Sequence, residues 1–510
     1  MSGWNTAQGG FSAQQLLGIR RGIEKESLRA LPSAALADTP HPAALGSALT
    51  HPHITTDFSE SQIELITGVH AGVESCLEEL RRIQHFTLSA MGQEMLWVSS
   101  MPCCLPADDA IPLGQYGSSN VGQAKTVYRS GLGYRYGRRM QTISGIHYNW
   151  SLPEVSSQAY FGLIRNFRRH AFLLLYLFGA SPAVCSTFVE GRDHSLQELQ
   201  PGTMGLPYAT SLRMGRLGYQ SAAQSALAVS YNSLEGYAGS LYQALTVPYR
   251  DYEAIGVRDA QGQFKQLATS LLQIENEFYG TIRPKRVIFQ GERPLHALRE
   301  RGVEYVEVRL MDLDPFEPVG INATTLRFLD VFLLHCLSQP SPNDHPAEIA
   351  AMARNQQAVA ERGRLPGLQL QRGQSMVGLQ DWGLQIVQEL QPLAQALDAA
   401  HGGQDYAQAV AHARQGLLAP DTLPSARLMR TMHDDYDNSF AQFMQARSAQ
   451  TKAQELAQPL EAHALAHLQQ LSQASLRQQR EIEAADSLPF DQYLTQYLSP
   501  QRLGQPSQAA

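Results

Sequence analysis

Strand-like segments that carry acidic residues two positions apart constrain the fold of this chain most. Side chains alternate between the two faces of a β-strand, so residues i and i+2 lie on the same face. Glu24 and Glu26 therefore face the same way, as do Glu307 and Arg309, and the aliphatic residues that alternate with Glu307 form an apolar opposite face. Burial of that apolar face would expose the acids together on the other side of a sheet.

Two further segments would add charged groups to the same surface. Asp57 and Glu64 lie in an alternating stretch over 54–67, and His147 alternates with aromatic residues over 141–152. Such a surface would repel itself without cations, and oxygen ligands with a single imidazole suit Mg²⁺ or Mn²⁺ holding a polyphosphate. Taken singly, each acidic pair is equally compatible with a solvated strand face, and His147 with a structural histidine.

Size and composition predict a soluble globular protein. The chain has 510 residues, of which 43% are apolar and 17% charged. Its net charge of −7, without a concentrated basic stripe, argues against nucleic acid as a partner. The apolar run over 171–178 is too short to cross a bilayer, and no secretory signal is visible. Five cysteines without a CxxC pair favour a reducing, cytoplasmic compartment.

Periodicity divides the chain into a sheet-based part and a helical part. The patterns predict strands over 18–28, 54–67 and 141–152, two more within 285–311, helices over 73–95, 158–178, 226–245 and 323–338, and a long functional loop over 190–218. Beyond Gln339 the chain is rich in Gln, Ala and Leu at helical spacing. We therefore expect a catalytic core over 1–338 and a helical region over 339–510 packed on it.

Arginines offer two anchors for anions. The planar fork of Arg309 could stabilise transferring phosphoryl oxygens or form a simple ion pair with Glu307. Arg213, in a loop near glycine, could hold a carboxylate or phosphate or lie on the surface. The sequence contains no Walker loop, GxGxxG motif or Ser–His–Asp motif.

Read together, these segments closely resemble bacterial glutamate–cysteine ligase of the proteobacterial type. The matching motifs run in order from about residue 15 to about residue 335 and include Gly22–Arg29, Leu45–Thr50, Ile54–Glu60, Ser100–Cys103, Gln115–Asn120, Gln141–Asn149, Ser211–Met214, Gln273–Tyr279, Ile282–Arg286 and Tyr305–Arg309. Cys104, Gly215 and Arg216 fall outside the family pattern, and the C-terminal third resembles the family only loosely.

The resemblance implies an α+β fold with a curved, mostly antiparallel sheet of the glutamine synthetase and guanidino kinase type, flanked by helices and followed by a helical C-terminal third. It also implies an acid–amino-acid ligase that forms ADP and phosphate. ATP would phosphorylate the γ-carboxylate of L-glutamate, and the amino group of L-cysteine would attack the γ-glutamyl phosphate. This reaction is the first step of glutathione biosynthesis. We expect a cytoplasmic monomer with these small-molecule substrates and no nucleic-acid or membrane partner.

The resemblance also assigns roles to individual residues. The metal ligands, for Mg²⁺ or alternatively Mn²⁺, would be Glu24, Glu26, Asp57, Glu64, His147 and Glu307. Arg309 would neutralise the transferring phosphoryl group, and Arg213 would hold an amino-acid substrate or stabilise the acyl phosphate. The cysteine pocket would comprise Phe58, Tyr128, Leu132, Gln141, Tyr219 and Tyr279.

Two alternatives differ in the chemistry they predict. A related carboxylate–amine ligase with another acceptor, or a kinase that stops at phosphoryl transfer, would differ mainly in the acceptor pocket. A non-catalytic scaffold that recruits a partner through its helical third would have lost metal ligands. All six candidate ligands are acidic or histidine, which disfavours the scaffold.

Overall fold

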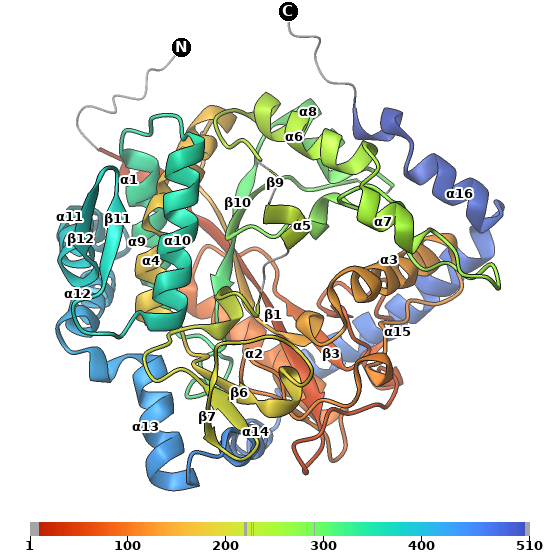
Figure 1. Cartoon of the computed structure of the whole chain (residues 1–510), viewed down its shortest axis with the longest axis horizontal. Helices are drawn as coiled ribbons and strands as arrows, with labels where there is room; N and C mark the ends of the chain where they lie inside the picture. The colour runs from red at the N-terminus through yellow and green to blue at the C-terminus, as the bar shows by residue number, and fades with distance from the viewer. Residues whose placement is uncertain (1–9, 219–221, 226, 228, 290, 505–510) are drawn as a thin grey trace, which may run out of the picture.

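A seven-stranded sheet forms the centre of the computed structural model, which describes residues 10–218, 222–225, 227, 229–289 and 291–504 (Figure 1). The strand order is β2-β3-β1-β5-β10-β9, with β4 paired to β1, and each pairing is antiparallel. The strands are β1 (Arg20–Ala30), β2 (Ile54–Thr56), β3 (Gln62–Ile66), β4 (Met95–Leu96), β5 (Ile146–Ser151), β9 (Ile282–Lys285) and β10 (Tyr305–Met311). The predicted mostly antiparallel α+β architecture is confirmed.

The predicted alternation places one face of this sheet in the core. Tyr148 and Trp150 of β5 and Val306 and Val308 of β10 are fully buried. Helices α2 (Val73–Ser89) and α4 (Ser157–Phe178) contact the sheet directly, and α9 (Ala323–Ser338) packs on both helices. The helices predicted over 158–178 and 323–338 are confirmed, and serine or asparagine side chains cap both N-termini.

Smaller elements surround the sheet. They are α1 (Ala13–Leu17), α3 (Asn120–Tyr136), α5 (Ala222–Ser225), α6 (Leu234–Thr246), α7 (Arg250–Ile255) and α8 (Pro294–Arg301). The helix predicted from residue 226 begins later, because the Ser233 side chain caps α6 by accepting a hydrogen bond from the Gly236 backbone N–H.

The long loop predicted over 190–218 is partly wrong. Strands β7 (Gln197–Gln200) and β8 (Thr203–Gly205) form a small antiparallel sheet with β6 (Ala183–Cys185). These strands are short, and the β7–β8 register shifts between two pairs, so the sequence shows no sustained alternation there.

The C-terminal third is helical, as predicted. It contains α10 (Pro346–Arg362), α11 (Leu379–His401), α12 (Asp405–Leu418), α13 (Pro424–Tyr436), α14 (Phe440–Leu456), α15 (Ala462–Ala485) and α16 (Phe490–Tyr497). A hairpin of β11 (Gln369–Arg372) and β12 (Ser375–Gly378) was not predicted. Helix α10 packs on α4, and α11 and α12 pack on α9, while α15 and α16 reach the side of the molecule that holds α3 (Figure 1).

These C-terminal helices share one hydrophobic cluster with the sheet, since Trp150, Leu329 and Leu390 all belong to it. The division of the chain at residue 338 into a core and a helical region stays a prediction. Across the described ranges, no helix is both long and apolar enough to span a membrane.

Candidate functional site

The strand register brings acidic side chains from three strands together on one face of the sheet. Glu24 of β1 pairs with His147 of β5, and Glu26 pairs with Glu64 of β3. On the other side of β5, Glu307 of β10 pairs with Asn149. Because these residues alternate with core residues, they occupy the face opposite the buried aliphatic and aromatic side chains.

His147 lies at the centre of this acidic face. Its Nδ1 atom is 3.1 Å from Glu24 Oε2, and its Nε2 atom is 3.6 Å from Glu26 Oε1. Two groups of three side chains place potential ligand atoms within 4.8 Å of one another: Glu24, His147 and Glu307, and Glu26, Glu64 and His147. Nε2 of His147 is buried and has no hydrogen-bond partner among the described residues. This donor set, with an unsatisfied imidazole nitrogen among carboxylates, fits a divalent cation.

Three cationic side chains surround Glu307. Lys285 Nζ lies 3.2 Å from Oε1, while Arg309 Nη1 and Arg283 Nη1 lie 3.1 Å and 3.7 Å from Oε2. Burial would raise the pKa of the Glu307 carboxyl, but these three positive charges hold it well below its usual range. Glu307 is therefore ionised.

The carboxyls nearer β3 behave in the opposite way. Burial and the charge of Asp57 raise the pKa of Glu26 to about 8. Burial also raises the pKa of Glu64 well above its usual value, with Asp57, Glu24 and Glu26 adding to the shift. Glu24 differs from these two: burial opposes its ionisation, but the hydrogen bond with His147 and the charge of Lys285 lower its pKa, as at Glu307. On the β1–β3 side, Glu26 and Glu64 therefore lie close to other carboxylates with too few positive charges to neutralise them.

Asp57 lies beside this cluster without joining either group of three. It follows β2 at the turn into β3, where its backbone oxygen accepts hydrogen bonds from Arg129 and from the Tyr116 hydroxyl. Its charge acts on Glu26 and Glu64, so it is a neighbour of the acidic face.

Arg213 approaches the same face from the loop after β8. It is buried, its Nη2 donates to the backbone oxygen of Arg309 at 2.8 Å, and its Nη1 lies 3.8 Å from Asp312 Oδ1. Asp312 in turn accepts hydrogen bonds from the hydroxyls of Ser181 and Ser211. This network holds the Arg213 guanidinium next to the backbone of the phosphoryl-binding candidate Arg309.

The residues predicted to bind cysteine fall into two adjacent sets. Phe58 and Leu132 are buried in one hydrophobic cluster, against which Tyr128 packs. Gln141 Nε2 donates to the Tyr279 hydroxyl at 2.7 Å, and the Tyr279 ring stands edge-on to Tyr136. Tyr219 lies outside the described residues.

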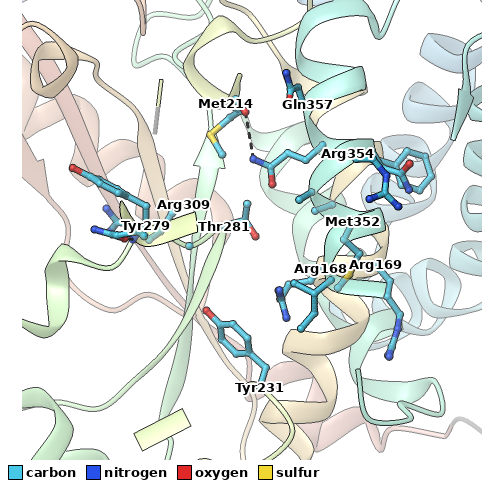
Figure 2. A pocket seen from close by; sticks show the side chains of 18 of the residues that line it. Arg168, Arg169, Met214, Tyr231, Tyr279, Thr281, Arg309, Met352, Arg354 and Gln357 are labelled. Carbon is cyan, nitrogen blue, oxygen red and sulfur yellow. Dashed lines mark hydrogen bonds between the residues drawn. The ribbon is translucent and has the colours of Figure 1, made fainter. Parts of the chain in front are cut away.

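A cavity of about 380 Å³ opens beside Arg309 (Figure 2). Tyr279, Thr281 and Arg309 line one wall, and residues of α4 and α10, among them Arg168, Met352 and Gln357, line the opposite wall. Its volume is within the range of small-molecule sites.

Sequence reasoning missed several residues that contact this site. Arg283 and Lys285 lie two positions apart in a motif that carried the family resemblance, so period two could have assigned both to the acidic face. Asn149, which donates to Glu24 Oε1 at 2.9 Å, shares a face with His147 by the same rule. Asp312 lies just past the end of β10, where alternation gives no guide.

Comparisons with known proteins agree on one family. A family model described as glutamate-cysteine ligase matches residues 8–359. A glutamate–cysteine ligase of Saccharophagus degradans is 46% identical over 506 residues, and that of Janthinobacterium sp. (strain Marseille) is 47% identical over 504 residues; both alignments cover 95% of each chain. The crystal structure of glutamate–cysteine ligase from Francisella tularensis in complex with AMP superposes with a TM-score of 0.90 at 38% identity, covering 94% of this chain and 97% of that one.

Proposed function

Because this chain belongs to the glutamate–cysteine ligase family, we propose that the acidic face of its sheet is the site where glutamate is activated and joined to cysteine. The family resemblance expected from the sequence is confirmed. The reaction of the family joins glutamate to cysteine with ATP, as the first step of glutathione synthesis. The observation that carries the assignment of the site is the convergence of Glu24, His147 and Glu307 beside Arg309.

The proposed metal ligands are Glu24, Glu26, Asp57, Glu64, His147 and Glu307. They fit Mg²⁺, or alternatively Mn²⁺, because the crowded carboxylates provide hard oxygen ligands, and because the buried Nε2 of His147 has no hydrogen-bond partner within the described part of the chain. Bound there, the cations would neutralise phosphate charge. Asn149 and the Gly145 backbone N–H, which donates to Glu26 Oε2 at 2.8 Å, orient the carboxylates.

The cavity beside Arg309 is the proposed site for ATP. It abuts the residue expected to meet the transferring phosphoryl group, and the Francisella tularensis relative was crystallised in complex with AMP. The planar guanidinium of Arg309 is suited to donate two hydrogen bonds to phosphoryl oxygens in a bidentate contact.

Phosphorylation of glutamate and attack by cysteine would each use residues of this site, namely the arginines and the acceptor pocket. The γ-carboxylate of L-glutamate attacks the terminal phosphorus of ATP, and ADP leaves. The amino group of L-cysteine then attacks the acyl carbon, and phosphate leaves. Arg213, which donates to the Arg309 backbone oxygen, would hold an amino-acid carboxylate or the acyl phosphate. Gln141 and Tyr279, which are hydrogen-bonded to each other, would contact the cysteine acceptor. Phe58, Tyr128 and Leu132, with Tyr219, would form the apolar part of the cysteine pocket, where a polarizable sulfur is favourable.

We also propose that the enzyme acts as a cytoplasmic monomer without nucleic-acid or membrane partners. The acidic net charge supports the absence of a nucleic-acid partner, and the five cysteines, unbridged within the described chain, support a reducing compartment.

The test is ADP release by the purified protein with Mg²⁺, ATP and L-glutamate, measured with and without L-cysteine, alongside mass spectrometry of the product. ADP release that depends on cysteine, together with γ-glutamylcysteine, supports the proposal. ADP without the dipeptide, or faster reaction with another amine, indicates a related acceptor. Folded protein without turnover indicates a scaffold.

A further inference from the structure

A pair of cysteines far from each other in sequence lies sulfur to sulfur. Cys104, which follows Cys103 directly and falls outside the family pattern, has its Sγ 3.5 Å from the Sγ of Cys185. Both thiols are free, as is that of Cys103. Cys104 is partly exposed, whereas Cys103 and Cys185 are buried.

The backbone holds both cysteines in place. The Cys104 N–H donates to the Ala34 oxygen at 3.0 Å, and the Cys104 oxygen accepts from the Leu36 N–H at 3.0 Å. Cys185 ends β6 and pairs with Thr203 of β8. A disulfide needs sulfur atoms about 2.05 Å apart. The two sulfurs are already 3.5 Å apart, so a disulfide requires them to approach by roughly 1.5 Å more.

A shared metal is a poor explanation for the pair. Two sulfurs supply half of a tetrahedral site. Among the described residues, the groups of three or more potential ligands are the two on the acidic face, and neither includes a cysteine.

We propose that Cys104 and Cys185 form a reversible intramolecular disulfide by exchange with a small-molecule disulfide. The Cys104 thiolate attacks one sulfur of the oxidant, which releases one thiol and leaves a mixed disulfide on Cys104. The Cys185 thiol loses its proton and attacks the Cys104 sulfur, which releases the second thiol. Two protein thiols are oxidised and one disulfide is reduced to two thiols, so the electrons balance.

The surroundings of the two thiols give each a separate role. The hydrogen bond with Cys185 lowers the pKa of the Cys104 thiol to about 7, so a large fraction is thiolate at neutral pH. The same interaction and burial raise the pKa of Cys185. Cys104, being partly exposed, is therefore the thiol that meets the oxidant, and Cys185 resolves the mixed disulfide from inside.

The bond would join two segments that support the proposed active site. Strand β6 begins two residues after Ser181, which contacts Asp312 and Ser211 in the network that holds Arg213. On the Cys104 side, the Ser100 backbone oxygen accepts from Ser144 N–H, next to Gly145. The disulfide would therefore brace the fold around the site.

The experiment uses the full-length protein, incubated with oxidised or reduced glutathione and then digested without reducing agent. We expect the oxidised sample to lose two titratable thiols and to yield a peptide linked through Cys104 and Cys185. We also expect its thermal midpoint to rise by about 4 °C, since the bond closes a long loop in a large protein, and to fall back when a reductant is added.

Variants separate this pair from the other cysteines. Cys104→Ala should abolish both the linked peptide and the thermal shift, while Cys103→Ala, at the neighbouring position, should retain them. Cys185→Ala is a second test that should match Cys104→Ala. An unchanged thiol count, a link through Cys103, or glutathione that stays on Cys104 with Cys185 free would each overturn the proposal. None of these readouts uses ATP or glutamate, so they are independent of the proposed ligase activity.

Discussion

Gly145 contacts both Glu26 and Arg213 of the proposed active site, and replacing it by alanine tests whether the position of Arg213 matters for the reaction. An added Cβ would lie 2.1 Å from Nη2 and 2.4 Å from Cζ of Arg213, where ordinary contacts are 3.4 Å or longer. Arg213 is 1% exposed and donates to the Arg309 backbone oxygen, so displacing its guanidinium breaks this hydrogen bond.

The expected magnitude follows from these contacts. Relief of the overlap requires the guanidinium or the Gly145 backbone to move by more than 1 Å, because an ordinary contact of 3.4 Å exceeds 2.1 Å by 1.3 Å. A misplacement of about 1 Å can cost roughly 100-fold in rate. Overpacking in a filled core costs about 1–3 kcal/mol of stability. We therefore expect Gly145→Ala to lower kcat about 100-fold and the free energy of unfolding by about 2 kcal/mol.

The assay is cysteine-dependent ADP release, combined with denaturant unfolding. Gly239→Ala is the matched control, because its added Cβ would meet nothing within 4 Å and the position lies inside α6. There alanine should gain about 0.5–1 kcal/mol by helix propensity and leave turnover unchanged. If Gly145→Ala turns over within twofold of the wild type, the position assigned to Arg213 in the reaction is wrong.

Three further substitutions test charges elsewhere. Glu307→Gln leaves Lys285, Arg283 and Arg309 around a neutral amide, so we expect the free energy of unfolding to fall by about 3 kcal/mol. In a metal titration we also expect activation by Mg²⁺ to be at least tenfold weaker. Wild-type activity at normal metal concentration would refute the assignment of Glu307 as a metal ligand. Arg309→Lys should lower kcat at least tenfold because an ammonium lacks the planar fork, and near-normal turnover would reduce Arg309 to an ion-pair partner. Burial lowers the pKa of His170 to about 3. As the pH drops from about 6.5 towards 3, the imidazole is therefore protonated in the unfolded chain but not in the folded one, and the free energy of unfolding falls. His170→Gln should flatten the decline in thermal midpoint between about pH 6.5 and pH 4.5, and a decline parallel to that of the wild type would contradict this.

Much of the central sheet could be predicted from side-chain alternation. In a strand whose apolar residues all lie on one face, only one orientation buries that face in the core. Trp150 and Val308 are therefore buried, and Glu307 faces the site. The same rule assigns Asn149 and Lys285 to the acidic face, although their types suggested no role. Alternation could not predict β7 and β8, where short polar strands pair with a shifted register.

The tertiary contacts of the site lay beyond such rules. Arg213 reaches Arg309 and Asp312 through a loop, and no local pattern specifies a contact between residues about a hundred positions apart. Likewise, the contact of Cys104 with Cys185 depends on where the small sheet packs, which the sequence of that sheet does not reveal. Long-range loop contacts are determined by packing of the whole domain and so escape inference from periodicity.

The charge distribution across the sheet explains why the acidic face needs two kinds of partner. On the β10 side, Lys285, Arg283 and Arg309 already compensate Glu307 and lower its pKa, so an incoming phosphate would meet arginines and a lysine. On the β3 side, Glu26 and Glu64 face Asp57, and their pKa values are raised. A divalent cation would relieve the crowding there by replacing protons on these carboxyls. We infer that one cation binds at Glu26, Glu64 and His147, where it relieves this crowding, and that a second binds at Glu24, His147 and Glu307, next to the arginine that would hold phosphate oxygens near β10.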